Sequence, residues 1–340
     1  MKRVFFYVCS MVLLGVICIG CSKKGEETAN NSNQITEKLS EQESSTSYED
    51  TSNSDTAAFE EETSVTEAPS IDAEVADVSP WKLLSESSVD TKVFYAGFLN
   101  DAIGVTVGYS GETSYTEDGG KTWSKSYNVS ACRYGLDLYD ETFIVDCGNS
   151  GVNLISKDKG KNWSRMGDFP LKNGSYNKFL SAIDTKNIYI GALKSLGRSN
   201  DGAVTWNDIA LPEGCDKIAG MFFMTTDIGY LLSMEGILYI TKDACETWTT
   251  QTIDLSGEKI STTAMPSVAI NFQDENHGMI VYYAKSFKLS CLKTEDGGIT
   301  WTSIEMPKTS LAAPYLSRNG QYLTLSSPTR KIGLFKLEKE

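Results

Sequence analysis

The stretch TEDGGITW, from Thr294 to Trp301, decides the fold because close variants of it recur along the chain. The other four copies are TEDGGKTW ending at Trp123, SKDKGKNW ending at Trp163, SNDGAVTW ending at Trp206 and TKDACETW ending at Trp248. One copy would suggest a binding or catalytic loop, whereas five copies indicate an architectural repeat. We call each copy a box.

The residue pattern of the box predicts a tight hairpin turn followed by a strand. Each box has a Ser or Thr two residues before an Asp, and a Trp five residues after that Asp. The carboxylate and the hydroxyl can accept hydrogen bonds from N–H groups of the turn, and a Gly two residues after the Asp permits a left-handed backbone. The Trp begins the next strand and buries its ring between sheets. The residues concerned are Asp118, Asp158, Asp201, Asp243 and Asp296, and Trp123, Trp163, Trp206, Trp248 and Trp301.

The spacing of the boxes predicts a ring of small sheets. Successive Trp residues are 40, 43, 42 and 53 positions apart, and runs such as GILYI and GMIVYYA before the boxes read as strands. Repeats of about 40–50 residues with four strands each are typical of propeller blades. Only three strands follow Trp301, and Trp81 lies 42 residues before Trp123. We therefore predict an all-β, six-bladed β-propeller over residues 80–340, closed by the N-terminal strand at Trp81.

The boxes resemble the Asp boxes of bacterial neuraminidase repeats. Such boxes also occur in xyloglucan-degrading propellers, in sortilin-type receptors and in the photosystem II stability and assembly factor family, and the compact period is most similar to that last group. The resemblance covers roughly residues 80–340 and implies a propeller whose boxes lie on the face away from the binding site. For the assembly-factor group it implies a protein scaffold without catalysis.

The N-terminus has the pattern of an export signal. Lys2 and Arg3 precede seventeen uncharged residues, Val4 to Gly20, which is at the lower limit of the roughly 17–25 residues that span a bilayer as a helix. An uncleaved anchor is the alternative. The sequence CIGC at 18–21 resembles the bacterial lipobox, although Cys18 stands where that pattern prefers Leu. The resemblance implies cleavage of a signal peptide, residues 1–20, and lipidation of Cys21, with several acyl chains such as palmitate holding the protein on the extracytoplasmic side of a membrane.

Residues 21–79 are expected to form a disordered acidic tether. From Ser22 to Ser79 there are fifteen Asp and Glu residues against three Lys, a net charge of −12 out of −14 for the chain. A segment so rich in Ser, Thr and Glu cannot bury enough apolar surface to offset its ordering entropy. The remainder is mildly acidic, so nucleic-acid binding is not expected.

Catalytic signals are weak in the sequence. Sialidases need an arginine cluster beginning with an Arg-Ile-Pro context, and no Arg after Ser79 is followed by Ile-Pro. A glycoside hydrolase needs two facing carboxylates, for which Glu112 and Glu235 are candidates, with solvated turn residues as the simpler interpretation. His277 is the only histidine, so a histidine-based zinc site or a catalytic triad cannot be built. We predict no cofactor and no metal.

Two further features concern the face opposite the boxes and the cysteines. If CRYGLDL and TFIVDC form a hairpin, Cys132 and Cys147 come opposite each other as a disulfide or as buried thiols. The long step from Trp248 to Trp301 places an excess of about ten residues in the link TIDLSGEKISTTAMPSVAIN, either a functional loop or a neutral insertion. Propellers bind ligands with the turns between second and third strands and with the links between blades. The candidate ligand-face residues are Tyr109, Glu112, Asn149, Lys194, Glu235, Lys285, Phe287 and Arg330.

The sequence thus predicts a monomeric, cell-surface lipoprotein whose propeller binds or scaffolds a protein or a cell-envelope polymer without changing it. The alternative is a glycoside hydrolase or lyase of the sialidase-like propeller type. Turnover that depends on Glu112 or Glu235 would distinguish the alternative from the binding module.

Overall fold

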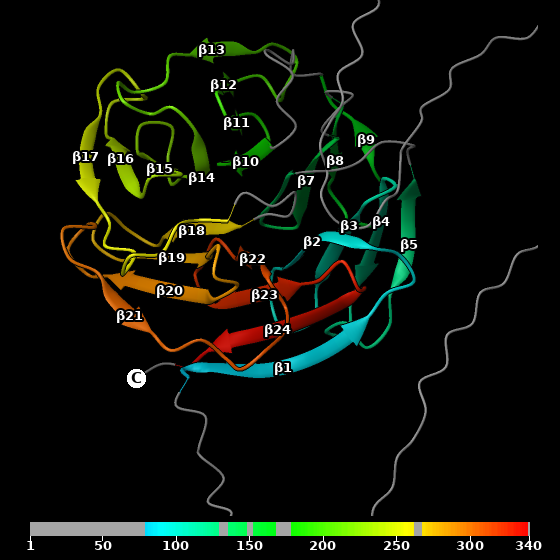
Figure 1. Cartoon of the computed structure of the whole chain (residues 1–340). Helices are drawn as coiled ribbons and strands as arrows, with labels where there is room; N and C mark the ends of the chain where they lie inside the picture. Colours follow the sequence, from blue (N-terminus) through cyan, green and yellow to red (C-terminus); the bar gives the residue numbers. More distant parts are fainter. Residues whose placement is uncertain (1–78, 129–134, 148–151, 168–177, 262–266, 339–340) are drawn as a thin grey trace, which may run out of the picture. The chain divides into compact units, whose positions relative to one another are not determined.

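The computed structural model of the protein describes residues 79–128, 135–147, 152–167, 178–261 and 267–338. In these ranges the regular structure is entirely β and consists of six four-stranded antiparallel sheets (Figure 1). No helix long and apolar enough to cross a membrane occurs in the same ranges.

The first three sheets, blades one to three, follow the chain without a crossover. Blade one consists of β2 (Val93–Phe98), β3 (Gly104–Gly108), β4 (Glu112–Thr116) and β5 (Ser124–Asn128). Blade two consists of β6 (Gly135–Tyr139), β7 (Thr142–Cys147), β8 (Val152–Ser156) and β9 (Ser164–Arg165). Blade three consists of β10 (Lys178–Ala182), β11 (Ile188–Ala192), β12 (Ser195–Ser199) and β13 (Asn207–Ile209).

Blades four and five repeat this order, and blade six combines both ends of the domain. Blade four consists of β14 (Ile218–Phe223), β15 (Gly229–Ser233), β16 (Ile237–Thr241) and β17 (Thr249–Thr252). Blade five consists of β18 (Val268–Phe272), β19 (Gly278–Tyr283), β20 (Leu289–Thr294) and β21 (Thr302–Ile304). Blade six consists of β22 (Ala313–Leu316), β23 (Tyr322–Ser326), β24 (Lys331–Leu337) and β1 (Trp81–Ser88).

The blades form a closed ring. The first strand of each blade contacts the first strand of the next, in the order β2, β6, β10, β14, β18 and β22, and β22 returns to β2. The domain is therefore a six-bladed β-propeller with a central channel lined by these inner strands (Figure 1). This architecture confirms the predicted fold class.

The ring closes through the N-terminal strand. β1 pairs antiparallel with β24, from Trp81 opposite Leu337 to Ser88 opposite Lys331, with a bulge between Leu83 and Ser85. β1 is thus the outer strand of blade six, as the position of Trp81 predicts. Closure packs blade six against blade one through a buried apolar cluster, whose two faces a linear array of blades would leave exposed.

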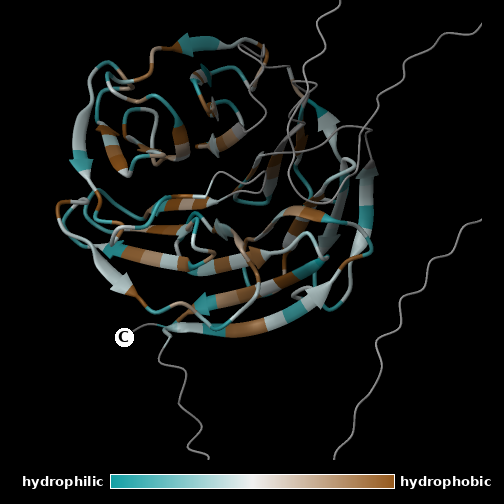
Figure 2. Cartoon of the chain, in the orientation of Figure 1, coloured by the Kyte–Doolittle hydropathy of each residue, from teal (hydrophilic) through white to brown (hydrophobic). Residues whose placement is uncertain are grey.

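Six apolar clusters hold the ring together, one between each pair of neighbouring blades. Each cluster contains or is packed against one tryptophan, and Trp81 fills this place between blades five and six. The inner strands are buried on both faces and therefore read as continuous apolar runs, such as IAGMFF in β14. Outer strands such as β13 and β17 are polar, and Figure 2 shows the hydrophobic colour gathered on strands nearer the channel.

Candidate binding face and central channel

The first box shows how the repeated residues build a turn. The Thr116 hydroxyl donates to Asp118 Oδ1 at 2.8 Å and accepts the N–H of Gly120 at 2.9 Å. Thr122 donates its N–H to Asp118 Oδ1 at 2.9 Å and its hydroxyl to Oδ2 at 2.6 Å. The four bonds have equivalents in the other four boxes, with the side-chain amide of Asn162 in place of the hydroxyl in the second box. Where Gly is replaced by Ala203 or Cys245, the backbone still has a positive φ, 66° and 75° respectively.

These bonds stabilise the ionised form of the box carboxylates. The Thr122 hydroxyl, and then its N–H, lower the pKa of Asp118 to about 2. The equivalent groups lower the pKa of Asp201 and of Asp296 to about 2. Because turn donors occupy both oxygens, each carboxylate serves the turn of its own blade.

The boxes share one face of the ring with the turns between first and second strands. In each blade that has a box, an N–H from the box donates to a carbonyl of that neighbouring turn, as from Gly119 to Ala102 at 2.9 Å and from Gly297 to Asn276 at 2.9 Å. Since strands alternate in direction, the turns between second and third strands and the links between blades lie on the opposite face. We call this opposite face the rim face.

The topology places the described candidate ligand-face residues on the rim face, in or next to turns of five different blades. Lys194, Glu235, Lys285, Phe287 and Arg330 are exposed. Asn149, the candidate from blade two, lies outside the described residues, as do Cys21 and Cys132 and the side chain of Cys147. Whether these residues bind a ligand stays a prediction.

Two of the candidates stabilise the blade that carries them. Tyr109 is half-buried and stacks on Phe94, with ring centroids 3.9 Å apart. The Glu112 carboxylate accepts the N–H of Ser110 at 3.2 Å within its own turn. Both contacts are local packing or capping interactions.

Glu112 and Glu235 do not form a pair across a common ligand site. Glu112 belongs to blade one and Glu235 to blade four, and in a ring of six these blades lie opposite each other. Paired glycosidase carboxylates lie only about 5–9.5 Å apart. The structure therefore does not bring the two candidate carboxylates together.

The long link after blade four is partly structural. Ile253, Leu255 and Ile260 are buried and pack into the cluster between blades four and five. Ile260 forms an isolated bridge with Ala284 next to the turn of blade five. Residues 262–266 of the link lie outside the described part of the chain.

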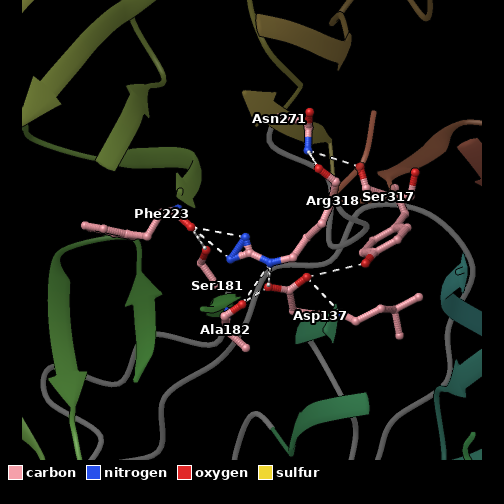
Figure 3. Close-up of polar contacts among 9 residues, drawn as sticks. Asp137, Ser181, Ala182, Phe223, Asn271, Ser317 and Arg318 are labelled. Carbon is pink, nitrogen blue, oxygen red and sulfur yellow. Dashed lines mark hydrogen bonds and ion pairs between the residues drawn. The ribbon is translucent and has the colours of Figure 1, made fainter. Parts of the chain in front are cut away.

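The central channel is crossed by Arg318, from the turn between β22 and β23 on the box face (Figure 3). Its Nε donates to the carbonyl of Ala182 at 2.9 Å, and Nη2 and Nη1 donate to the carbonyl of Phe223 at 2.8 and 3.2 Å. Asn271 Nδ2 donates to the carbonyl of Arg318 at 2.9 Å. One side chain of blade six thus binds the inner strands of blades three and four.

Asp137, on inner strand β6, completes this network. Its Oδ2 lies 4.0 Å from Arg318 Nε and accepts the N–H of Ala182 at 2.6 Å, while its Oδ1 accepts the N–H of Leu138 at 2.8 Å. Burial raises the pKa of Asp137, and the Arg318 charge and these N–H groups act in the opposite direction. Desolvation, opposed mainly by Arg318, governs whether this carboxyl is ionised.

A small cavity of about 50 Å³ lies in the channel beside Arg318. It is lined by all six inner strands, including Phe179, Val268 and Pro314, which lie near the rim-face ends of their strands. Pockets for drug-sized ligands measure about 300–1,000 Å³. This cavity has room for a few water molecules and no larger ligand.

Sequence reasoning missed the Arg318–Asp137 network. In the sequence, Arg318 is one of the arginines after Ser79 that Ile-Pro does not follow, and its neighbours give no sign of a buried position. The available signal was Asp137 itself, an acid inside the apolar run YGLDLY of a strand now seen to be buried. A charge at such a position requires a buried partner.

The remaining described groups offer no reactive thiol or metal centre. Burial raises the pKa of Cys215 to about 11 and of Cys245 to about 12, and it also raises the pKa of Cys291. No group of three or more His, Cys, Asp or Glu side chains suited to a metal ion occurs in the ranges described above.

Comparison with known proteins bears on the fold alone. No protein-family model and no curated protein matches the sequence. A chain of the mitotic checkpoint complex matches with a TM-score of 0.53 at 11% identity, over 84% of this chain and 100% of that chain. A streptogramin B lyase matches with a TM-score of 0.51 at 11% identity, over 76% of this chain and 98% of that chain. The structure of YCF48 bound to D1 peptide matches with a TM-score of 0.49 at 14% identity, over 77% of this chain and 96% of that chain. This match is too distant to support an argument. With its closed ring of six sheets, the chain belongs structurally with the β-propellers.

Proposed function

We propose that this protein is an exported, lipid-anchored binding module whose rim face holds a protein or a cell-envelope polymer without chemically changing it. The closed channel is the observation that carries the proposal. Arg318 crosses the channel on the box side, and the cavity beside it measures about 50 Å³. A ligand of substantial size therefore does not fit beside Arg318, and we assign its contacts to the turns and links of the rim face.

The exposed side chains of the rim face suit contact over a wide area. Lys194, Glu235, Phe287 and Arg330 come from four different blades and mix both charge signs with an aromatic ring. A rigid scaffold that displays loops of varied chemistry is a common basis for protein recognition. The opposite positions of Glu112 and Glu235 disfavour catalysis by this pair of carboxylates.

The anchor and the tether support a place at the cell surface. The lipobox-like sequence ending at Cys21 would supply the lipid, and the acidic residues 22–79 would extend by self-repulsion away from an anionic surface. A long tether gives the propeller reach toward an extended target. The resemblance of the boxes to Asp boxes is consistent with a scaffold role.

The test combines capture and turnover measurements on the chain from Ser22 to Glu340. The chain is coupled to a resin and exposed to envelope extracts, and envelope polysaccharides and sialosides are screened for hydrolysis. We expect a captured protein or polymer that is lost in a Lys194→Ala, Phe287→Ala, Arg330→Ala variant, while a matched triple variant on the box face, Lys157→Ala, Lys186→Ala, Val204→Ala, retains it. Turnover of a polysaccharide that disappears in Glu112→Gln or Glu235→Gln would refute the proposal.

A further inference from the structure

Four of the described turns between second and third strands close with the same hydrogen bond. The N–H of one residue donates to the carbonyl three residues earlier at 3.0 to 3.3 Å, and the donors are Gly111, Gly236, Phe287 and Arg330. The φ angles of these four residues are 87°, 83°, 66° and 75°, all in the left-handed region that favours glycine. Blades one and four place glycine at this position, whereas blades five and six place Phe287 and Arg330 there, where a side chain strains the backbone.

The two strained side chains point to solvent. Phe287 is 78% exposed, and its ring makes an edge contact with the ring of Tyr283 at 6.3 Å. Arg330 is exposed as well. Because neither side chain packs in the core, burial does not offset the strain. Residues held in strained conformations without such a structural reason concentrate at functional sites.

Three lysines accompany Phe287. Lys285 and Lys288 belong to the same turn, and the N–H of Lys285 donates to the carbonyl of Lys259 at 2.8 Å, which places the link after blade four next to this turn. Arg330 lies in the equivalent turn of blade six, the neighbour of blade five in the ring. We call Lys259, Lys285, Phe287, Lys288 and Arg330 the basic sector, and all five residues are exposed.

Direct ion pairs do not neutralise the basic sector. Within the described ranges none of its four cations forms a salt bridge, whereas the next lysine along the chain, Lys331, pairs with Glu86 at 3.4 Å. The flanking links add the cation Lys308 and the acids Asp254, Glu258, Glu305 and Asp90. Of these acids, Asp254 accepts the N–H of Ser256 at 2.7 Å inside its own turn, and Glu258 is half-buried. The sector thus presents four unpaired cations and an exposed aromatic ring.

The composition of the basic sector indicates the chemistry of its partner. Aromatic residues and arginine are enriched in the centres of protein interfaces, where a few such side chains carry most of the binding energy. The cations attract carboxylates, and the rings of Phe287 and Tyr283 favour aromatic or aliphatic side chains. An acidic protein segment with apolar side chains satisfies both requirements, whereas a linear polyphosphate offers the Phe287 ring no apolar group.

We propose that the basic sector is the part of the rim face that contacts the partner, and that it binds an acidic segment of a partner protein that also carries aromatic or aliphatic side chains. This inference rests on the proposed function, because it names the partner class and the contact residues of the same face. Phe287 and Arg330 anchor the segment, and the lysines attract its carboxylates. Because these charges are exposed, their attraction weakens as salt rises.

Fluorescence anisotropy with a supplied acidic probe tests this inference on the chain from Ser22 to Glu340, which keeps the whole compact unit of the propeller. The probe is a fluorescein-labelled random copolymer of glutamate and tyrosine. Labelled polyglutamate provides the same charge without rings, and labelled polyphosphate provides a different anion. We expect the copolymer to bind about tenfold more tightly than either comparison polymer, and its affinity to fall about tenfold between about 50 and 500 mM NaCl.

Glycine at the two strained positions separates binding from stability. In the double variant Phe287→Gly, Arg330→Gly the melting temperature should equal or exceed that of the parent, because glycine adopts a positive φ without strain. Its affinity for the copolymer should nevertheless fall about tenfold. Lys259→Gln, Lys285→Gln, Lys288→Gln should lower both the affinity and its salt dependence. The matched triple variant on the box face, Lys121→Gln, Lys157→Gln, Lys186→Gln, should keep the parent's affinity.

Several outcomes would overturn the inference. These are an absence of copolymer binding, polyphosphate binding as tight as that of the copolymer, equal affinities of the glycine variant and the parent, or an equal loss in the box-face variant. A lower melting temperature of the glycine variant would assign Phe287 and Arg330 to stability and would overturn it as well. Because the probe is supplied, an envelope partner captured without copolymer binding refutes this inference alone. Polysaccharide turnover that disappears in Glu112→Gln or Glu235→Gln refutes the proposed function itself.

Discussion

Replacing Arg318 with Met should destabilise the whole propeller, because it removes the cation that crosses the channel. The guanidinium donates three hydrogen bonds to two carbonyls and lies 4.0 Å from Asp137, and the two side chains are only 18% and 10% exposed. The methionine fills similar volume but leaves the Asp137 carboxylate buried without its cation. Breaking a buried pair in this way costs about 3–5 kcal/mol, which includes the lost donors to the carbonyls.

Chemical unfolding followed by tryptophan fluorescence measures this cost as the change in the free energy of unfolding. Arg330→Met makes the same chemical change at an exposed turn and should stay within about 0.5 kcal/mol of the parent. A double-mutant cycle with Asp137→Ala isolates the pair, and we expect a coupling of about 1–3 kcal/mol. A coupling near zero, or an Arg318→Met variant as stable as Arg330→Met, would refute the role given to the channel network.

The cost should also depend on pH. Burial already raises the pKa of Asp137 in the folded state, and loss of Arg318 raises it further. A carboxyl with a raised folded pKa contributes stability that is present below its unfolded pKa and is lost as pH rises through the folded value. The free energies of unfolding of the Arg318→Met variant and the parent should therefore differ less at pH 5 than at pH 8. A difference that stays constant between these pH values would contradict this account.

Three other predictions follow from the boxes and the two ends of the chain. Trp81→Ala should lower the free energy of unfolding by about 3–5 kcal/mol, because Trp81 is only 2% exposed between blades five and six. Deletion of residues 80–86 should lower the melting temperature of the entire domain, which calorimetry measures. Because the pKa values of Asp118 and Asp296 are lowered in the folded state, these carboxylates contribute stability above their unfolded pKa near 4, and this contribution is lost as pH falls toward about 2. In Asp118→Ala the melting temperature should be a few degrees lower than that of the parent at pH 7. The further fall in melting temperature below pH 4 should be smaller in the variant than in the parent. Cys21→Ala should leave unprocessed precursor and abolish incorporation of labelled fatty acid, and continued labelling would place the anchor elsewhere.

The sequence alone determined the architecture because each box is a local structure. The hydrogen bonds of Asp118 run to residues at most four positions away, so the amino-acid sequence of a box is sufficient to define its turn. The period between tryptophans then sets the size of a blade, and a missing final strand together with Trp81 indicates how the ring closes. Each inference rests on contacts that are near in sequence or on strict repetition.

The tertiary structure alone decided what occupies the channel and what the rim displays. Arg318 binds Ala182 and Phe223, which are 136 and 95 residues away, and the Tyr315 hydroxyl contacts Asp137 across 178 residues. No local pattern encodes such pairs, because they depend on the radius at which six inner strands meet. In the same way, Glu112 and Glu235 look equivalent in sequence, yet the ring separates them onto opposite blades. The fold also brings Lys259 next to the turn of Phe287, through the hydrogen bond from the N–H of Lys285 to the carbonyl of Lys259. The repeat builds the scaffold through short-range bonds, and only closure of the ring fixes which distant side chains share a site.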